Sequence, residues 1–247
     1  MSKSILVIGE SCLDVFYYCD CTRLAPEAPV PILDFRSKSE NRGMAHNVFK
    51  NIQSLNVDCN IVTNYNWKKI TKTRLVDYKT NQMFLRLDNS KKYNRVNLDK
   101  INFSKYGCVV ISDYNKGFLT TEKISEIVDS FDGPVFIDTK KNYLPKLDAY
   151  VKINEHEYNN FKSSIEKLLI TRGGKGCEYK GKLYPAEKVN VFDVVGAGDT
   201  FLSALVYFYL KCGRIEEAIP YANKAAAIAV SNFGTYALTK EDVDTIL

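Results

Sequence analysis

Five short apolar runs, rich in β-branched residues, constrain the fold of this chain more than any other feature. They are Ser4–Glu10, Cys108–Asp113, Pro134–Thr139, Tyr150–Asn154 and Lys167–Gly173. Each run is apolar nearly throughout, as is typical of strands that are covered on both faces in a parallel sheet. The runs therefore predict a buried, mostly parallel sheet.

Helical patterns fall between these runs. Two of them place their apolar residues on one helical face: Ile124, Ile127, Val128 and Phe131 in the first, and Met44, Val48, Ile52 and Leu55 in the second. The C-terminal third reads as mostly helical. Strands that alternate with helices indicate an α/β sheet with right-handed crossovers.

Two segments interrupt this alternation. "APEAPVPILDFRSKSE" contains three closely spaced prolines, and "KTRLVDYKTNQMFLRLDN" alternates as a β-hairpin does. Because proline confines a strand to the edge of a sheet, we expect these segments to form a small sheet that stands off the main one. The chain shows no internal repeat, no low-complexity tract and no clear linker between domains.

Composition and charge narrow the function classes. The 247 residues are 45% hydrophobic and 26% charged, which suits one large globular domain. The net charge of +5 is spread along the chain, whereas nucleic-acid binders concentrate basic residues in an arm or helix. We therefore expect anionic small-molecule substrates and no nucleic-acid partner.

Neither a membrane span nor a metal cluster is predicted. No run approaches the roughly 18 apolar residues that a transmembrane helix needs. The seven cysteines have irregular spacing, without a C-x-x-C pair. Reduced thiols in a cytoplasmic protein are favoured over disulfides or zinc.

The chemistry concentrates in "DVVGAGDTF". Glycines allow positive φ and leave no Cβ to obstruct a bound group. The amides of Gly196, Ala197 and Gly198 would lie unpaired at the start of a helix near Asp199, where free donors and the helix dipole attract anions. A carboxylate beside an anion site suits a base that takes the proton of a hydroxyl attacking phosphorus. A simple helix-capping role for Asp199 is the alternative reading.

The motif resembles the signature of the ribokinase-like (PfkB) carbohydrate kinases, and further matches follow in order along the chain. They are "IGESCLD", "TRLAPEAPVPI", "NRGMAHNVFKNIQSL", "TKTRL", "FLRLD", "VVISDYNKGFL", "VFIDTKK", "NEHE", "TRGGKG" and "ANKAAAIAV". "APEAPVP" is most similar to the D-glycero-β-D-manno-heptose 7-phosphate kinases, which phosphorylate the C1 hydroxyl. The resemblance implies a single ribokinase-like α/β domain over residues 1–247, with lid segments at about 15–40 and 72–90.

The resemblance also implies roles for individual residues. Asp199 becomes the general base, and Gly196, Ala197 and Gly198 become the anion hole for the γ-phosphoryl group of ATP. Glu157, with Asn154, would organise Mg²⁺ and its waters, although surface charge is the alternative for Glu157. Thr171, Gly173 and Gly176 would lie beside the nucleotide, with an ordinary tight turn as the alternative. Asn223 would lie near the adenine, with a role in helix packing as the alternative.

On the sugar side, Asp14 aligns with a carboxylate that binds sugar hydroxyls. Gly43 and Asn47 align with the turn that holds the sugar. Arg23 and Lys116 are candidates for a substrate phosphate, with a solvated cation as the alternative for each. A homodimer through the lid strands is implied as well.

The chain also departs from the family pattern. His46 stands where a small residue is usual, which makes the sugar turn bulkier. A βα unit before "TKTRL" is missing, and the stretch between "NEHE" and the nucleotide strand is short. We expect a trimmed kinase without a fused nucleotidyltransferase domain. A different PfkB-type sugar or nucleoside kinase, and a catalytically silent nucleotide- or sugar-binding module, remain the alternatives.

Overall fold

The computed structural model describes residues 4–89, 93–232 and 234–246, and its largest element is an eight-stranded sheet. Its strands are β1 (Ser4–Gly9), β4 (Cys59–Val62), β7 (Tyr106–Asp113), β8 (Val135–Thr139), β9 (Tyr150–Asn154), β10 (Leu168–Thr171), β11 (Cys177–Tyr179) and β12 (Lys182–Tyr184). The spatial order is β12-β11-β10-β9-β8-β7-β1-β4. All neighbours from β4 to β10 pair in parallel, while β11 and β12 add an antiparallel edge.

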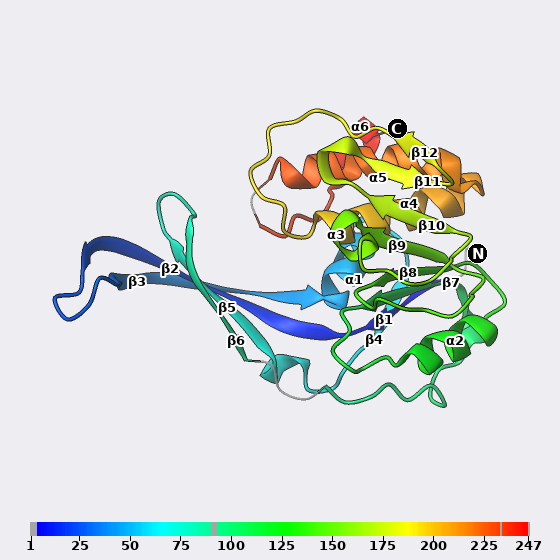
Figure 1. Ribbon diagram of the computed structural model, residues 1–247, viewed down its shortest axis with the longest axis horizontal. Helices are drawn as coiled ribbons and strands as arrows, with labels where there is room; N and C mark the ends of the chain where they lie inside the picture. Colours follow the sequence, from blue (N-terminus) through cyan, green and yellow to red (C-terminus); the bar gives the residue numbers. More distant parts are fainter. Residues whose placement is uncertain (1–3, 90–92, 233, 247) are drawn as a thin grey trace.

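Helices cover both faces of this sheet, as Figure 1 shows. They are α1 (Ala45–Ser54), α2 (Thr121–Asp129), α3 (Glu155–Tyr158), α4 (Ala197–Cys212), α5 (Ile215–Val230) and α6 (Lys240–Ile246). On one face, α1, α4, α5 and α6 bury their apolar residues against the strands. On the other face, α2 contributes Ile124, Ile127 and Val128 to a second core.

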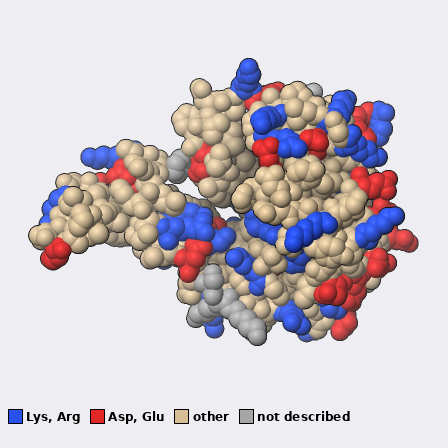
Figure 2. Space-filling view, in the orientation of Figure 1, with Lys and Arg blue, Asp and Glu red and all other residues tan. Residues whose placement is uncertain are grey.

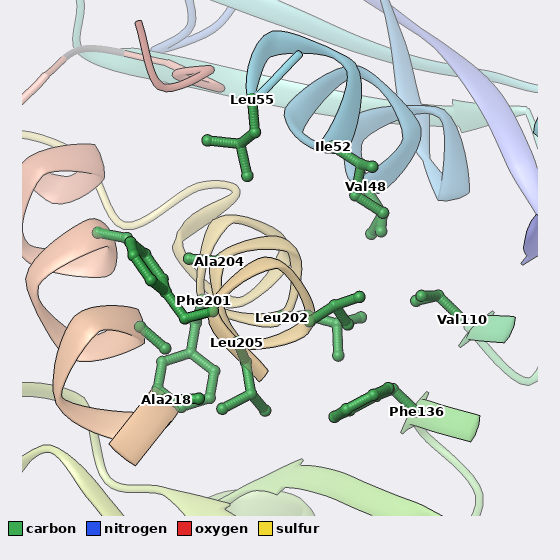
Figure 3. Packing of buried hydrophobic residues seen from close by; sticks show 14 of the residues in the cluster. Val48, Ile52, Leu55, Val110, Phe136, Phe201, Leu202, Ala204, Leu205 and Ala218 are labelled. Atoms are coloured by element: carbon green, nitrogen blue, oxygen red, sulfur yellow. The ribbon is translucent and has the colours of Figure 1, made fainter. Parts of the chain in front are cut away.

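Strand periodicity explains the two cores. Successive side chains of a strand point to opposite faces of the sheet, so Val110 of β7 packs under α1 and α4, while Val109 packs with α2. Figure 3 shows Val48 and Ile52 of α1 lying beside Leu202 of α4 and directed toward Val110 and Phe136 of the sheet. The helix α4 is therefore held on several sides, and this fixes the position of its first turn.

The second sheet has four strands and projects from the body as an arm (Figure 1). It contains β2 (Ser11–Leu24), β3 (Pro31–Met44), β5 (Thr71–Asp77) and β6 (Met83–Asn89), in the order β3-β2-β5-β6. These strands come from the two segments that the sequence analysis assigned to a lid. Pro31 opens β3, which is an edge strand, as the prolines predicted.

The structure agrees with a trimmed chain in two places and corrects one detail. Between α1 and β5 lie only β4 and the 3₁₀ helix Trp67–Lys69, so the strand that follows the first helix is kept and no α-helix follows it. Between β9 and β10, residues 155–167 form the four-residue helix α3 and otherwise irregular structure. The predicted strands all formed. Strands β4, β11 and β12 were not predicted, because a segment of three or four residues is too short to show a clear hydrophobic pattern.

Within the described ranges, no helix is both long and apolar enough to cross a membrane.

Candidate active site

A cavity of about 610 Å³ lies at the carboxyl ends of β8, β9 and β10, against the first turn of α4. Ten of the residues singled out in the sequence line it: Asn154, Glu157, Thr171, Gly173, Gly176, Gly196, Ala197, Gly198, Asp199 and Asn223. The sheet topology explains why these residues lie together, because ligands of open α/β sheets bind beyond the carboxyl ends of the strands.

The first turn of α4 supplies backbone donors to this cavity. Helix α4 begins at Ala197, two residues before the position expected from the sequence, because Gly196 takes the left-handed conformation at the N-cap, with φ of 82°. The Ala197 amide donates weakly to the Val194 carbonyl oxygen at 3.4 Å. Among the described residues, the amides of Gly196 and Gly198 have no hydrogen-bond partner, so they are free to bind an anion.

Asp199 is buried but reaches the cavity. Its side chain accepts a hydrogen bond from Asn47 Nδ2 at 2.7 Å and a longer one from the Tyr114 hydroxyl at 3.3 Å. Burial raises the pKa of Asp199 to about 6, and the negative charge of Asp138 adds to the effect. The hydrogen bond from Asn47 and the charge of Lys152 oppose the rise. A carboxylate poised near neutral pH is suited to act as a general base.

Tyr114 and Glu10 were not predicted from the sequence. The buried Glu10 carboxylate accepts the backbone N–H groups of Tyr114 at 2.8 Å and Lys116 at 3.0 Å, and thereby fixes the loop after β7. Burial, reinforced by the charge of Asp113, raises the pKa of Glu10. The Tyr114 hydroxyl stays protonated because burial and the Asp199 charge raise its pKa well above the usual value. The available sequence signal was a glutamate that directly follows an apolar run.

Lys152 and Asp138 were also missed. Lys152 lies in β9 and is buried, with its Nζ 2.6 Å from Asp138 Oδ2 at the end of β8. Both residues line the cavity. The signal was present in "YVKIN", where a lysine interrupts a run that otherwise predicts a strand covered on both faces.

The far end of the cavity has apolar walls. Val189, Val191 and Val194 come from the loop after β12, and Ala227 and Val230 come from α5. Such walls suit the flat apolar faces of a heterocyclic base. Asn223 is buried here, but its amide already donates to the carbonyl oxygens of Tyr184 at 2.8 Å and Pro185 at 3.2 Å. These two hydrogen bonds connect α5 to the start of the loop that follows β12.

Glu157 is engaged by protein groups on both oxygens. Oε2 accepts the Asn154 backbone N–H at 2.9 Å in a capping box, and Oε1 pairs with Lys140 at 3.0 Å. Across the described residues, no three His, Cys, Asp or Glu side chains gather closely enough to hold a metal alone. That donor set fits Mg²⁺ only when water and phosphate oxygens supply most of its ligands, which is how this ion is usually held.

The sugar-side candidates lie where the arm joins the body. Asp14 of β2 is buried and pairs through Oδ1 with Arg74 Nη1 of β5 at 2.6 Å. A Cβ at Gly43 would overlap the Asp14 carboxylate, so glycine is required there for close approach. Lys72 of β5 lies 5.3 Å from the centre of the Tyr114 ring. Figure 2 shows Lys and Arg side chains gathered at this junction.

Two basic candidates are not brought to the cavity. Arg23 is exposed near the free end of β2, where it pairs in register with Ile32, far along the arm from α4 (Figure 1). Lys116 is exposed, and only its backbone is anchored, through Glu10. The positive charge of Lys152 acts on Asp199 instead, and Lys72 and Lys140 lie 5.3 and 5.1 Å from the centre of the Tyr114 ring.

Comparisons with known proteins relate this chain to carbohydrate kinases. The pattern described as "pfkB family carbohydrate kinase" matches residues 156–242. The bifunctional protein HldE of Haemophilus influenzae is 30% identical over 302 aligned positions, which include 98% of this chain and 63% of that protein. The chain therefore spans less than two thirds of the length of this curated relative. The alignment is longer than the chain, so the relative has residues that this chain lacks.

Solved structures share the fold. Ribokinase from Thermotoga maritima superimposes with a TM-score of 0.71 at 19% identity, covering 99% of both chains. Arabidopsis thaliana ribokinase, whose structure contains ribose and ATP, gives a TM-score of 0.71 at 12% identity, covering 100% of this chain and 99% of that one. The fold is ribokinase-like.

Proposed function

Since the chain belongs to the pfkB family of carbohydrate kinases, we propose that it transfers the γ-phosphoryl group of ATP to a sugar hydroxyl. The observation that carries the proposal is the position of Asp199. Its carboxylate lies in the first turn of α4, next to free backbone donors, and opens into a cavity large enough for a nucleotide. A proton acceptor, Asp199, therefore lies next to a site for an anion, as phosphoryl transfer requires.

The proposed mechanism uses this chain's own groups. The acceptor hydroxyl lies between Asp199 and the arm, and Asp199 takes its proton as the oxygen attacks the γ-phosphorus. The bond from phosphorus to the β–γ bridging oxygen breaks, and its electron pair leaves with ADP. The amides of Gly196 and Gly198 stabilise the charge on the transferring group. Asn47 and Tyr114 hold the carboxylate in place.

ATP and Mg²⁺ are the proposed cosubstrate and its metal. The base would lie against the apolar walls near Val194 and Val230. Thr171, Gly173 and Gly176 line the path of the phosphates. Glu157 would hold Mg²⁺ through the water ligands of the ion, and the ion would supply positive charge that neutralises the phosphates. A cytoplasmic location belongs to the proposal, because the chemistry consumes ATP and seven free cysteines suit a reducing compartment.

The proposed acceptor is D-glycero-β-D-manno-heptose 7-phosphate, phosphorylated at C1 to the 1,7-bisphosphate. Support comes from the similarity to HldE proteins over nearly the whole chain. The basic side chains at the arm, including Lys72 and Arg74, suit an acceptor that already carries a phosphate. Other sugar phosphates are the competing acceptors.

The test is a panel of sugars, sugar phosphates and nucleosides with ATP and Mg²⁺, analysed by mass spectrometry and phosphorus NMR. Transfer to C1 of the heptose 7-phosphate is expected. Transfer to a different acceptor would retain the kinase and reject the heptose assignment. Nucleotide or sugar binding without transfer to any acceptor would favour a binding module.

The pH dependence of kcat is a direct prediction. With a pKa of about 6 for Asp199, the active form is the carboxylate above that pH. We expect kcat to fall as pH drops through about 6 and to level off above about 7. The second ionisation of a phosphate group also lies near pH 6, so KM for the acceptor is measured in parallel. An acid limb confined to KM would contradict the role of Asp199.

We also propose a homodimer in which the arms of two copies meet. Phe35, Met83, Leu85 and Leu87 expose apolar surface on β3 and β6, the edge strands of the arm. Exposed edges of this kind need covering. Light scattering is expected to give a dimer, and Leu85→Lys with Leu87→Lys should shift it to monomer. A wild-type monomer at micromolar concentration would refute this.

A further inference from the structure

A buried lysine faces the first turn of α4. Lys152 is 5% exposed, and its Nζ lies 3.0 Å from the position that a Cβ on Gly198 would occupy. The ammonium group therefore touches the glycine turn whose amides face the cavity. Its one hydrogen bond among the described residues goes to Asp138 Oδ2, at 2.6 Å.

Two features of this position act against a cation, and neighbouring negative charges must offset them. The N-terminus of a helix carries partial positive charge, which repels a cation. Burial of an ammonium group costs free energy that a single carboxylate offsets only in part. Asp138 and Lys152 are register partners on β8 and β9, and both line the cavity, so their pairing holds the ammonium on the cavity side of the sheet, within reach of the turn.

The surrounding groups keep the ammonium charged. Burial by itself lowers the pKa of Lys152, but the charges of Asp138, Asp199 and Glu157 outweigh burial and raise it. These three carboxylates come from β8, α4 and α3, and Tyr114 and Asn47 complete the polar groups around Asp199. Lys152 is therefore a fixed positive charge at the wall of the cavity, beside free amide donors.

We propose that Lys152 is a catalytic residue whose ammonium group contacts the phosphoryl group during its transfer, while Asp138 positions it. The inference rests on the proposed function. As the hydroxyl oxygen bonds to phosphorus, its proton goes to Asp199, and the bond to ADP breaks. Lys152 exchanges no proton. It stabilises the negative charge of the equatorial oxygens, together with the amides of Gly196 and Gly198.

The first experiment compares Lys152→Met with Lys141→Met. Lys141 is also buried and paired, with Asp113 Oδ1 at 3.2 Å, but it does not line the cavity. We expect Lys152→Met to lower kcat about 10²- to 10³-fold, as for loss of one donor to a developing anion. KM for the acceptor should stay nearly unchanged, and Lys141→Met should retain the wild-type kcat. A rise in KM at unchanged kcat would overturn the proposal.

A double variant separates catalysis from folding. Lys152→Met leaves Asp138 unpaired, whereas Lys152→Met with Asp138→Asn removes both charges and restores a neutral wall. If Lys152 contacts the phosphoryl group, the double variant folds stably and stays slow. Recovery of kcat to the wild-type value would show that Lys152 only balances Asp138, and would overturn the proposal.

A binding measurement keeps this test independent of the acceptor. Calorimetry compares ADP with ADP plus aluminium fluoride, a mimic of the transferring group, in the presence of Mg²⁺. Lys152→Met should weaken the fluoride complex about 100-fold and leave ADP binding unchanged. Equal losses for both ligands, or no loss, would reject the contact. If the wild type binds the fluoride complex but phosphorylates no acceptor, the assigned kinase function fails while the Lys152 contact stands.

Discussion

Replacement of Asp199 by asparagine is expected to lower kcat by about 10³-fold, within the range for loss of a general base. Asparagine keeps the size of the side chain and one acceptor oxygen for Asn47 or Tyr114, so binding of ATP should change little. The loss is measured under saturating acceptor and ATP at pH 8, where the wild-type carboxylate is ionised because its pKa is about 6.

The same variant should not lose stability. Burial raises the pKa of Asp199 from 3.8 to about 6, so the folded state disfavours the carboxylate. This cost is absent below the unfolded pKa, grows as pH rises toward 6 and is then complete, at roughly 3 kcal/mol. Removal of the charge therefore leaves the free energy of unfolding at pH 8 unchanged or higher.

The control is Asp129→Asn, an exposed carboxylate at the end of α2 on the opposite face of the sheet. It should leave kcat unchanged. If Asp199→Asn retained more than about a tenth of wild-type kcat, general-base catalysis by this residue would be excluded.

Substitution of Gly176 by alanine is expected to reduce the free energy of unfolding by about 3 kcal/mol or more. Gly176 has φ of 104°, and an added Cβ would overlap the Tyr184 carbonyl oxygen and lie 2.6 Å from the Ala186 nitrogen. All of these are backbone atoms that cannot rotate away. Displacement of residues 184–186 would also move a wall of the cavity, so binding of a non-hydrolysable ATP analogue should weaken.

Gly174→Ala provides the matched control. It lies two residues earlier in the same turn, where an added Cβ meets nothing within 4 Å, so the free energy of unfolding should remain close to wild type. Urea unfolding and calorimetry measure both variants. Equal stability of the two variants would show that close packing at Gly176 is not required.

Local pattern was sufficient for much of the fold. The apolar face of α2 was readable because Ile124, Ile127 and Val128 recur at helical spacing, and all three are buried. The five predicted strands also formed, because each of their runs is apolar nearly throughout. The glycine turn before Asp199 was also readable, because positive φ at Gly196 restricts the residue type and the next residues begin an apolar helix.

The remainder of the site was not readable from local pattern. Lys152 looked like an isolated charge in a strand, and Tyr114 like one aromatic residue in a loop. Their importance depends on partners that are distant along the chain: Lys152 meets the turn at Gly198, and Tyr114 meets Asp199. The sequence likewise suggested Arg23 for a phosphate, but the length of β2 carries that residue out along the arm.

The alternating strands and helices, the arm segments and the carboxylate at the glycine turn were predictable from the sequence, because each depends on residues within a few positions of one another. Which groups surround that carboxylate depends on the three-dimensional fold. Asn47 and Asp199 are separated by 152 positions, yet lie 2.7 Å apart. Such a contact depends on the order of the strands and on how α1 and α4 pack, and these are properties of the whole core.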